Sequence, residues 1–66
     1  MAKCLTAKQR KVCEMISRGY KAREIAVALG IGRRTVEEHR EAAYKKLGVN
    51  KAVEMVKKMF LEGNLA

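Results

Sequence analysis

The fold is decided by residues 22–41, which read AREIAVALGIGRRTVEEHRE. Apolar residues at helical spacing come first, Gly30 interrupts them, and a second helical pattern begins at about residue 33. Ala26 is small where two helices must cross closely, Gly30 permits the positive φ of a tight turn, and Val36 anchors the second helix. These features predict a helix-turn-helix over about 22–41.

Further helical patterns divided by glycines extend this prediction in both directions along the chain. The first helix is expected after Thr6, whose hydroxyl forms a capping box with Gln9, and Gly19 is expected to end it. No proline and no low-complexity linker divides residues 1–66, so we expect a single domain. Its fold class is predicted as all-α, a compact four-helix bundle containing the helix-turn-helix. The remaining helices are expected over 22–29, 33–47 and about 51–62.

A domain this small needs a source of stability besides its hydrophobic core, because about 60 residues bury only roughly 60% of the surface that the unfolded chain exposes. Cys4, Cys13 and the single histidine, His39, do not provide the four ligands of a zinc site, so we predict no metal and no cofactor. A disulfide stays open, but no signal peptide is apparent, and we expect both cysteines to be reduced, with Cys13 in the core. Self-association is therefore the remaining source of additional stability.

Charge is the most informative bulk property of the chain. Fifteen Lys and Arg against seven Asp and Glu give a net charge of +8 and a pI near 9.9, which fits a polyanionic partner. The alternative is that lysine-rich helices only keep a small protein in solution. Because no apolar run approaches the roughly 20 residues that span a bilayer, we expect a cytoplasmic protein.

Two other function classes fit the composition poorly. One histidine and no aspartate cannot supply the nucleophile, base and orienting acid of an enzyme of the triad type, so we predict no enzymatic activity. Binding to a membrane surface is also disfavoured, because the basic residues are spread along the chain rather than opposed to one wide apolar face.

Several short stretches carry a more specific signal. They are Leu5-Thr6, Arg23-Glu24-Ile25-Ala26, Leu29-Gly30-Ile31, Arg34-Thr35-Val36-Glu37 with His39-Arg40, and Lys46-Leu47-Gly48-Val49. With them the chain resembles the LuxR-type (GerE-like) DNA-binding domain from Leu5 to about Val56. The resemblance implies a four-helix DNA-binding module of bacterial transcription control that often dimerises through its last helix. The start at Met1, close to the first helix, suggests the stand-alone form of this module.

The second helix of a helix-turn-helix enters the major groove of DNA, so 33–47 is the expected recognition helix. At 100° per residue, Val36, Ala43 and Leu47 face the core. The opposite face is acidic, which phosphates disfavour, although Glu can accept a hydrogen bond from cytosine N4 and Arg34 can pair with Glu38. We expect base readout by Arg34, Glu37, Glu38 and Glu41.

Phosphate contacts need cations, hydroxyls or backbone amides at the groove edges. Any one of the candidate residues could instead be an ordinary solvated side chain. His39 lies on the flank of its helix, where it could either bond DNA or fill the seam between helices. The candidates are Lys21, Arg23, Arg33, Thr35, His39, Lys45 and Lys46.

The expected fourth helix is more apolar than one buried face requires. Val53, Val56 and Phe60 are spaced to complete the core, whereas Met55 and Met59 form a second stripe that is either core or interface. A homodimer would suit a two-fold pseudo-palindromic DNA site. We expect the dimer interface to contain Met55, Met59 and Tyr44.

Together these patterns predict a sequence-specific transcriptional regulator that binds double-stranded DNA as a homodimer through the major groove. The alternative is a protein-interaction module of the same fold, which binds another regulator or RNA polymerase through the acidic face of its third helix.

Overall fold

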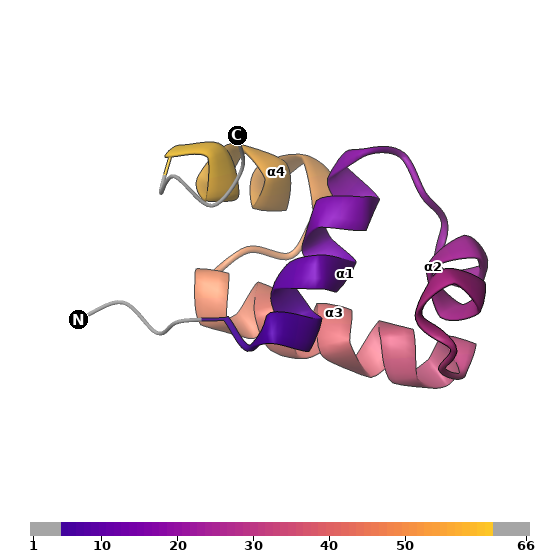
Figure 1. The fold of residues 1–66 in the computed structure, drawn as a ribbon. Coiled ribbons are helices and arrows are strands. Elements are labelled where there is room, and N and C mark those ends of the chain that lie inside the picture. The colour runs from indigo at the N-terminus through magenta and orange to yellow at the C-terminus, as the bar shows by residue number, and fades with distance from the viewer. Residues whose placement is uncertain (1–4, 62–66) are drawn as a thin grey trace.

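A computed structural model of the protein describes residues 5–61, which form four α-helices and, within that range, no strand. The helices are α1 (Ala7–Ser17), α2 (Ala22–Leu29), α3 (Arg33–Leu47) and α4 (Ala52–Leu61). In Figure 1, α1 lies between α4 at the top and α3 along the lower edge, with α2 packed at the side. The predicted all-α fold and the helix-turn-helix of α2 and α3 are confirmed. The fourth helix begins one residue later than predicted.

The start of α1 confirms the predicted capping box. The Thr6 hydroxyl accepts a hydrogen bond from the backbone N–H of Gln9 at 3.1 Å, and Gln9 Oε1 accepts one from the N–H of Thr6 at 3.1 Å. Two backbone donors that the helix itself cannot satisfy thereby find partners. At the start of α2 a lysine, Lys21, occupies the N-cap position, where Ser, Thr, Asp or Asn is preferred, and the Glu24 carboxylate accepts the N–H of Lys21 at 2.8 Å.

The turn between α2 and α3 depends on Gly30. This residue has φ +68°, a left-handed conformation that costs a residue with a Cβ about 1–2 kcal/mol. Just after it, the N–H of Ile31 bonds back to the carbonyl of Ala26 at 3.1 Å. The helix therefore ends abruptly, and after Gly32 in extended conformation α3 begins in a new direction.

The core consists of two clusters that share α1. One joins α1 to α2 and α3, the other joins α1 to α3 and α4, and half-buried Ile16 packs against both. The predicted inward face of α3 is confirmed, since Val36, Ala43 and Leu47 are all buried. The first cluster contains Val12, Met15, Ile25, Ala26 and Val36, and the second contains Leu5, Cys13, Ala43, Leu47, Met55 and Met59.

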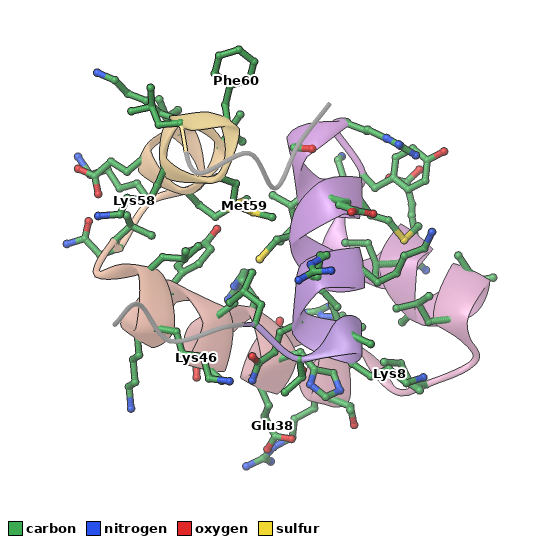
Figure 2. The ribbon with its side chains drawn as sticks, turned by 60° about the vertical axis from the view of Figure 1, so that its left-hand side comes forward. Lys8, Glu38, Lys46, Lys58, Met59 and Phe60 are labelled. Atoms are coloured by element: carbon green, nitrogen blue, oxygen red, sulfur yellow. The ribbon has the colours of Figure 1, made fainter. Side chains whose placement is uncertain are left out.

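The orientation of α4 differs from the prediction. Met55 and Met59 are completely buried, whereas Val53 is 80% and Phe60 64% exposed. Figure 2 shows the same contrast, with Met59 directed toward α1 and Phe60 projecting away from the domain. The expectation that Val53 and Phe60 complete the core was wrong, although Val56 does pack against it. Flexible methionine side chains fill the irregular space beside α1 instead.

Cys13 is the buried, free thiol that the sequence predicts. Burial, together with a smaller effect of the neighbouring Glu14 carboxylate, raises its pKa from 9.0 to about 11. Cys4, the other half of the disulfide that the sequence leaves open, lies outside the described residues. Within residues 5–61, no cluster of three potential metal ligands is present, and no helix is long and apolar enough to cross a membrane.

Candidate nucleic-acid interface

The outward face of α3 is the most distinctive surface of the domain. Arg34, Glu38, Glu41 and Lys45 are all exposed there, as the helical projection predicts. The Arg34 side chain is 92% exposed and that of Glu38 is 65% exposed. In Figure 2, Glu38 points away from the body of the domain. Because Val36, Ala43 and Leu47 hold the opposite face in the core, this surface is displayed on a rigid support.

Two ion pairs link successive turns at the start of this face. Arg33 Nε lies 3.4 Å from Glu37 Oε2, and Arg34 Nε lies 3.8 Å from Glu38 Oε2, which confirms the predicted pairing of Arg34 with Glu38. Exposed pairs of this kind contribute at most about 1 kcal/mol, and a positive charge in the first turn opposes the helix dipole. The arginines are therefore held loosely and can exchange a carboxylate for another anion.

These four residues and Glu41 line one shallow pocket on the surface of α3. All four predicted base-reading residues, Arg34, Glu37, Glu38 and Glu41, thus lie together. Glu37 is half-buried, whereas the other three are exposed. Within residues 5–61, Glu41 makes no salt bridge.

The predicted phosphate-contacting residues are more scattered. Arg33 and Lys45 are exposed at opposite ends of α3, about 18 Å apart along its axis. Lys21 and Arg23 are exposed at the start of α2, on the other helix of the motif. Thr35, His39 and Lys46 are half-buried. Cations therefore bracket the acidic centre of α3 rather than forming one continuous patch.

A second pocket lies where α3 meets the turn into α4. Half-buried Tyr44 lines it, and burial raises the pKa of the Tyr44 phenol, an effect that the Arg40 guanidinium opposes. Arg40 and Lys51 add positive charge beside Lys45, and neither was among the DNA contacts predicted from the sequence. Arg40 precedes Tyr44 by four residues, one helical turn, and this spacing could have predicted that Arg40 lies beside Tyr44. The lining residues are Arg40, Glu41, Tyr44, Lys45, Val49, Asn50, Lys51 and Ala52.

The predicted dimer contacts need correction at two positions. Met55 and Met59 have no exposed surface, because both are packed in the cluster that joins α1, α3 and α4, so they cannot contact a second subunit in this packing. The exposed apolar residues of α4 are Val53, Phe60 and Leu61, the last 72% exposed. Helical periodicity alone could not distinguish these from core residues.

Comparison with known proteins agrees with this geometry. The sequence profile of the bacterial regulatory proteins of the luxR family matches residues 3–59. The chain is 41% identical over 56 residues to the transcriptional regulatory protein UhpA of Escherichia coli K12, covering 85% of this chain and 29% of that protein. It is 40% identical over 52 residues to the transcriptional regulatory protein YdfI of Bacillus subtilis 168, covering 79% and 24%. The chain thus spans less than a third of the length of these relatives.

Among solved structures, the transcription factor GerE superposes with a TM-score of 0.87 at 26% identity, and the match covers 97% of each chain. The response regulator ChrA of a heme-sensing two-component system superposes with a TM-score of 0.88 at 24% identity, over 94% of this chain and 31% of that one. The second likeness shows a shared fold.

Proposed function

This chain belongs to the LuxR family of bacterial regulatory proteins, as a DNA-binding domain of that type, and we propose that it binds specific double-stranded DNA sites as a homodimer. The recognition helix α3 enters the major groove with its N-terminal turns toward the base edges. The observation that carries the proposal is the outward face of α3, on which Arg34 is 92% exposed at the start of a helix fixed by three buried residues. The net charge of +8 supplies the attraction to DNA.

The residues divide into two roles on the DNA. Arg34, Glu37, Glu38 and Glu41 read bases, because they occupy the first turns of α3 that face the groove floor. Cations and polar groups around them contact the sugar-phosphate backbone and set the register of the protein on the duplex. This second group contains Lys21, Arg23, Arg33, Thr35, His39, Lys45 and Lys46.

Dimerisation places two recognition helices on a two-fold site. Val53, Phe60 and Leu61 are the apolar surface of α4 that a second copy would cover, and Tyr44 is a further contact. An isologous contact sets the two α3 helices about one DNA turn apart, on adjacent half-sites. The regulator would act in the cytoplasm, without enzymatic activity or cofactor, and could also contact RNA polymerase.

A second candidate function is protein binding through the same acidic surface. The exposed Glu38 and Glu41 favour it, because exposed carboxylates attract a basic protein, and the Arg34 pair of Glu38 is long and exposed to solvent. Another transcriptional regulator or RNA polymerase would then occupy the face that we assign to DNA.

Titration of random-sequence duplex DNA at two salt concentrations, followed by fluorescence anisotropy, separates these functions. We expect binding that weakens steeply with salt, and weaker binding by Arg34→Ala and Lys45→Ala, since each cation lost reduces the number of counterions released. An absence of binding even at low salt would refute the DNA proposal. Capture of a protein that depends on Glu38 and Glu41 would then support the second candidate.

A further inference from the structure

We propose that Glu38 and Glu41 are specificity-determining residues, which restrict tight binding to half-sites that present a cytosine amino group to α3 and keep binding to all other DNA weak. This inference rests on the proposed DNA-binding function and deepens it, because it names the base chemistry that the domain requires. From the sequence alone, the acidic face of α3 counts against DNA binding. The structure allows the same face to act as a filter, which means that Glu38 and Glu41 permit tight binding to sites with a suitably placed cytosine and weaken binding to other DNA.

The first step is geometric. At 100° per residue, Arg34, Glu38, Glu41 and Lys45 fall within about 60° around the axis of α3. All four are exposed, and Glu38 projects outward from the domain (Figure 2). A groove that receives Arg34 and Lys45 must therefore receive both carboxylates as well. While the cations engage the DNA, both carboxylates are thus brought close to its base edges and phosphates.

The second step is the cost of a carboxylate in the groove. It loses water there and is repelled by the phosphates, so it needs a hydrogen-bond donor on a base edge. Guanine presents the acceptors O6 and N7, and thymine presents the acceptor O4 and a methyl group. The N6 amino group of adenine lies between two acceptors, its own N7 and the O4 of the paired thymine, whereas the N4 amino group of cytosine has an acceptor, the O6 of the paired guanine, on one side only. Cytosine is therefore the base that suits Glu38 and Glu41.

The third step concerns the state before DNA binds. Glu38 lies 3.8 Å from Arg34, and Glu37 lies 3.4 Å from Arg33, so the leading arginines are partly neutralised by their own helix. On a matched site, Arg34 can exchange this contact for guanine O6 and N7, which leaves Glu38 free to accept from cytosine. On an unmatched site the carboxylates gain nothing, and the pairs compete with the phosphates for the arginines.

The test compares Glu38→Gln and Glu41→Gln with a matched control, Glu54→Gln, which removes the same charge from α4. Glu54 is exposed on α4 and does not line the pocket on the outward face of α3, so the control leaves the recognition face untouched. Glutamine at position 54 can still accept the backbone N–H of Asn50, as Glu54 does at 3.3 Å. Circular dichroism verifies that each variant is folded.

Two measurements are made on the whole chain. In the first, random-sequence duplex is titrated, and we expect Glu38→Gln and Glu41→Gln to bind about fivefold more tightly than the native chain, while Glu54→Gln changes less than about twofold. In the second, sites are selected from a random pool and sequenced. The native chain should enrich cytosine at one or more fixed positions of each half-site, and each glutamine variant on α3 should lose that preference in favour of adenine, which glutamine reads.

The outcomes separate this inference from the function on which it rests. If the native chain binds DNA but the α3 variants retain both its base preference and its affinity for random duplex, the filter is refuted and DNA binding stands. Equal tightening by all three variants would also refute the filter, since only net charge would then matter. If the native chain binds no duplex at low salt, both proposals fail.

Discussion

Arg34 and Glu38 form an exposed pair one helical turn apart, with Nε and Oε2 separated by 3.8 Å. Such a pair contributes little to folding, so Arg34→Ala should change the free energy of unfolding by less than about 0.5 kcal/mol, measured by urea denaturation. Binding to the selected DNA site should nevertheless weaken at least about fivefold, because a base contact is lost. Arg33→Ala serves as the comparison, since loss of a phosphate contact should weaken matched and random DNA alike. If Arg34→Ala, like Arg33→Ala, weakened binding to the selected site by no more than binding to random DNA, the division of roles would be contradicted.

Gly30 should be intolerant of a side chain because of its backbone rather than lack of space. Its φ is +68°, and a Cβ built there would meet no heavy atom within 4 Å. We expect Gly30→Ala to lower the free energy of unfolding by about 1–2 kcal/mol. Gly30→Asn should lose less, because asparagine tolerates the left-handed conformation. Equal losses for alanine and asparagine in thermal or urea unfolding would argue against this cause.

Truncation of the two apolar stripes of α4 should affect two different properties, the stability of the fold for the buried stripe and self-association for the exposed one. Met59 has no exposed surface, so Met59→Ala should destabilise the domain by about 2–5 kcal/mol through the cavity it leaves. Phe60 is 64% exposed, and Phe60→Ala should leave unfolding at low protein concentration nearly unchanged. Sedimentation equilibrium should show that it weakens self-association instead. A Phe60→Ala chain that dimerises as well as the native one would exclude this stripe from the interface.

The Thr6 cap should contribute measurably to the stability of α1. Removal of its hydroxyl leaves the N–H of Gln9 without the acceptor now at 3.1 Å, and Thr6→Ala should cost about 1 kcal/mol in urea unfolding. Thr6→Ser keeps the acceptor and should retain most of the stability. A serine variant as unstable as the alanine variant would show that the methyl group, not the hydroxyl, matters.

Burial of the Cys13 thiol makes stability depend on pH in the alkaline range. Folding raises the pKa of this group from 9.0 to about 11, so the unfolded chain ionises first. The stabilisation is complete below about pH 9 and is lost as the pH rises through 11, with a loss of about 1–3 kcal/mol. Urea unfolding at pH 8 and 10.5 should show a steeper decline for the native chain than for Cys13→Ala. Tyr44, whose pKa is raised mainly by burial, is present in both chains, so that part of its contribution cancels, and only the smaller part caused by the Cys13 charge is removed together with Cys13.

The local features of the fold could be predicted from the sequence because each depends on few residues. The Thr6 and Gln9 capping box, the turn at Gly30 and the bounds of α3 involve partners within five positions along the chain. The face of α3 that is buried in the core was equally predictable, since Val36, Ala43 and Leu47 form a single apolar stripe. The exposed position of Arg34, Glu38 and Glu41 followed from it directly.

The orientation of α4 could not be predicted in the same way. Its two apolar stripes, Val53 with Phe60 and Met55 with Met59, are both compatible with helical periodicity. Which stripe turns inward depends on the direction in which the chain leaves Gly48 and on the shape of the space beside α1. That choice is made by tertiary packing, for which the sequence of α4 holds no separate signal.

The division of α3 into an anchored face and a displayed face allows its target to change independently of its stability. Substitutions at Arg34, Glu38, Glu41 or Lys45 alter groups that contribute almost nothing to the core, whereas Val36, Ala43 and Leu47 hold the helix in place. A duplicated copy of this domain could therefore acquire a new operator through a few surface exchanges, without any compensating change inside. For the same reason it is a suitable scaffold for engineered DNA readers.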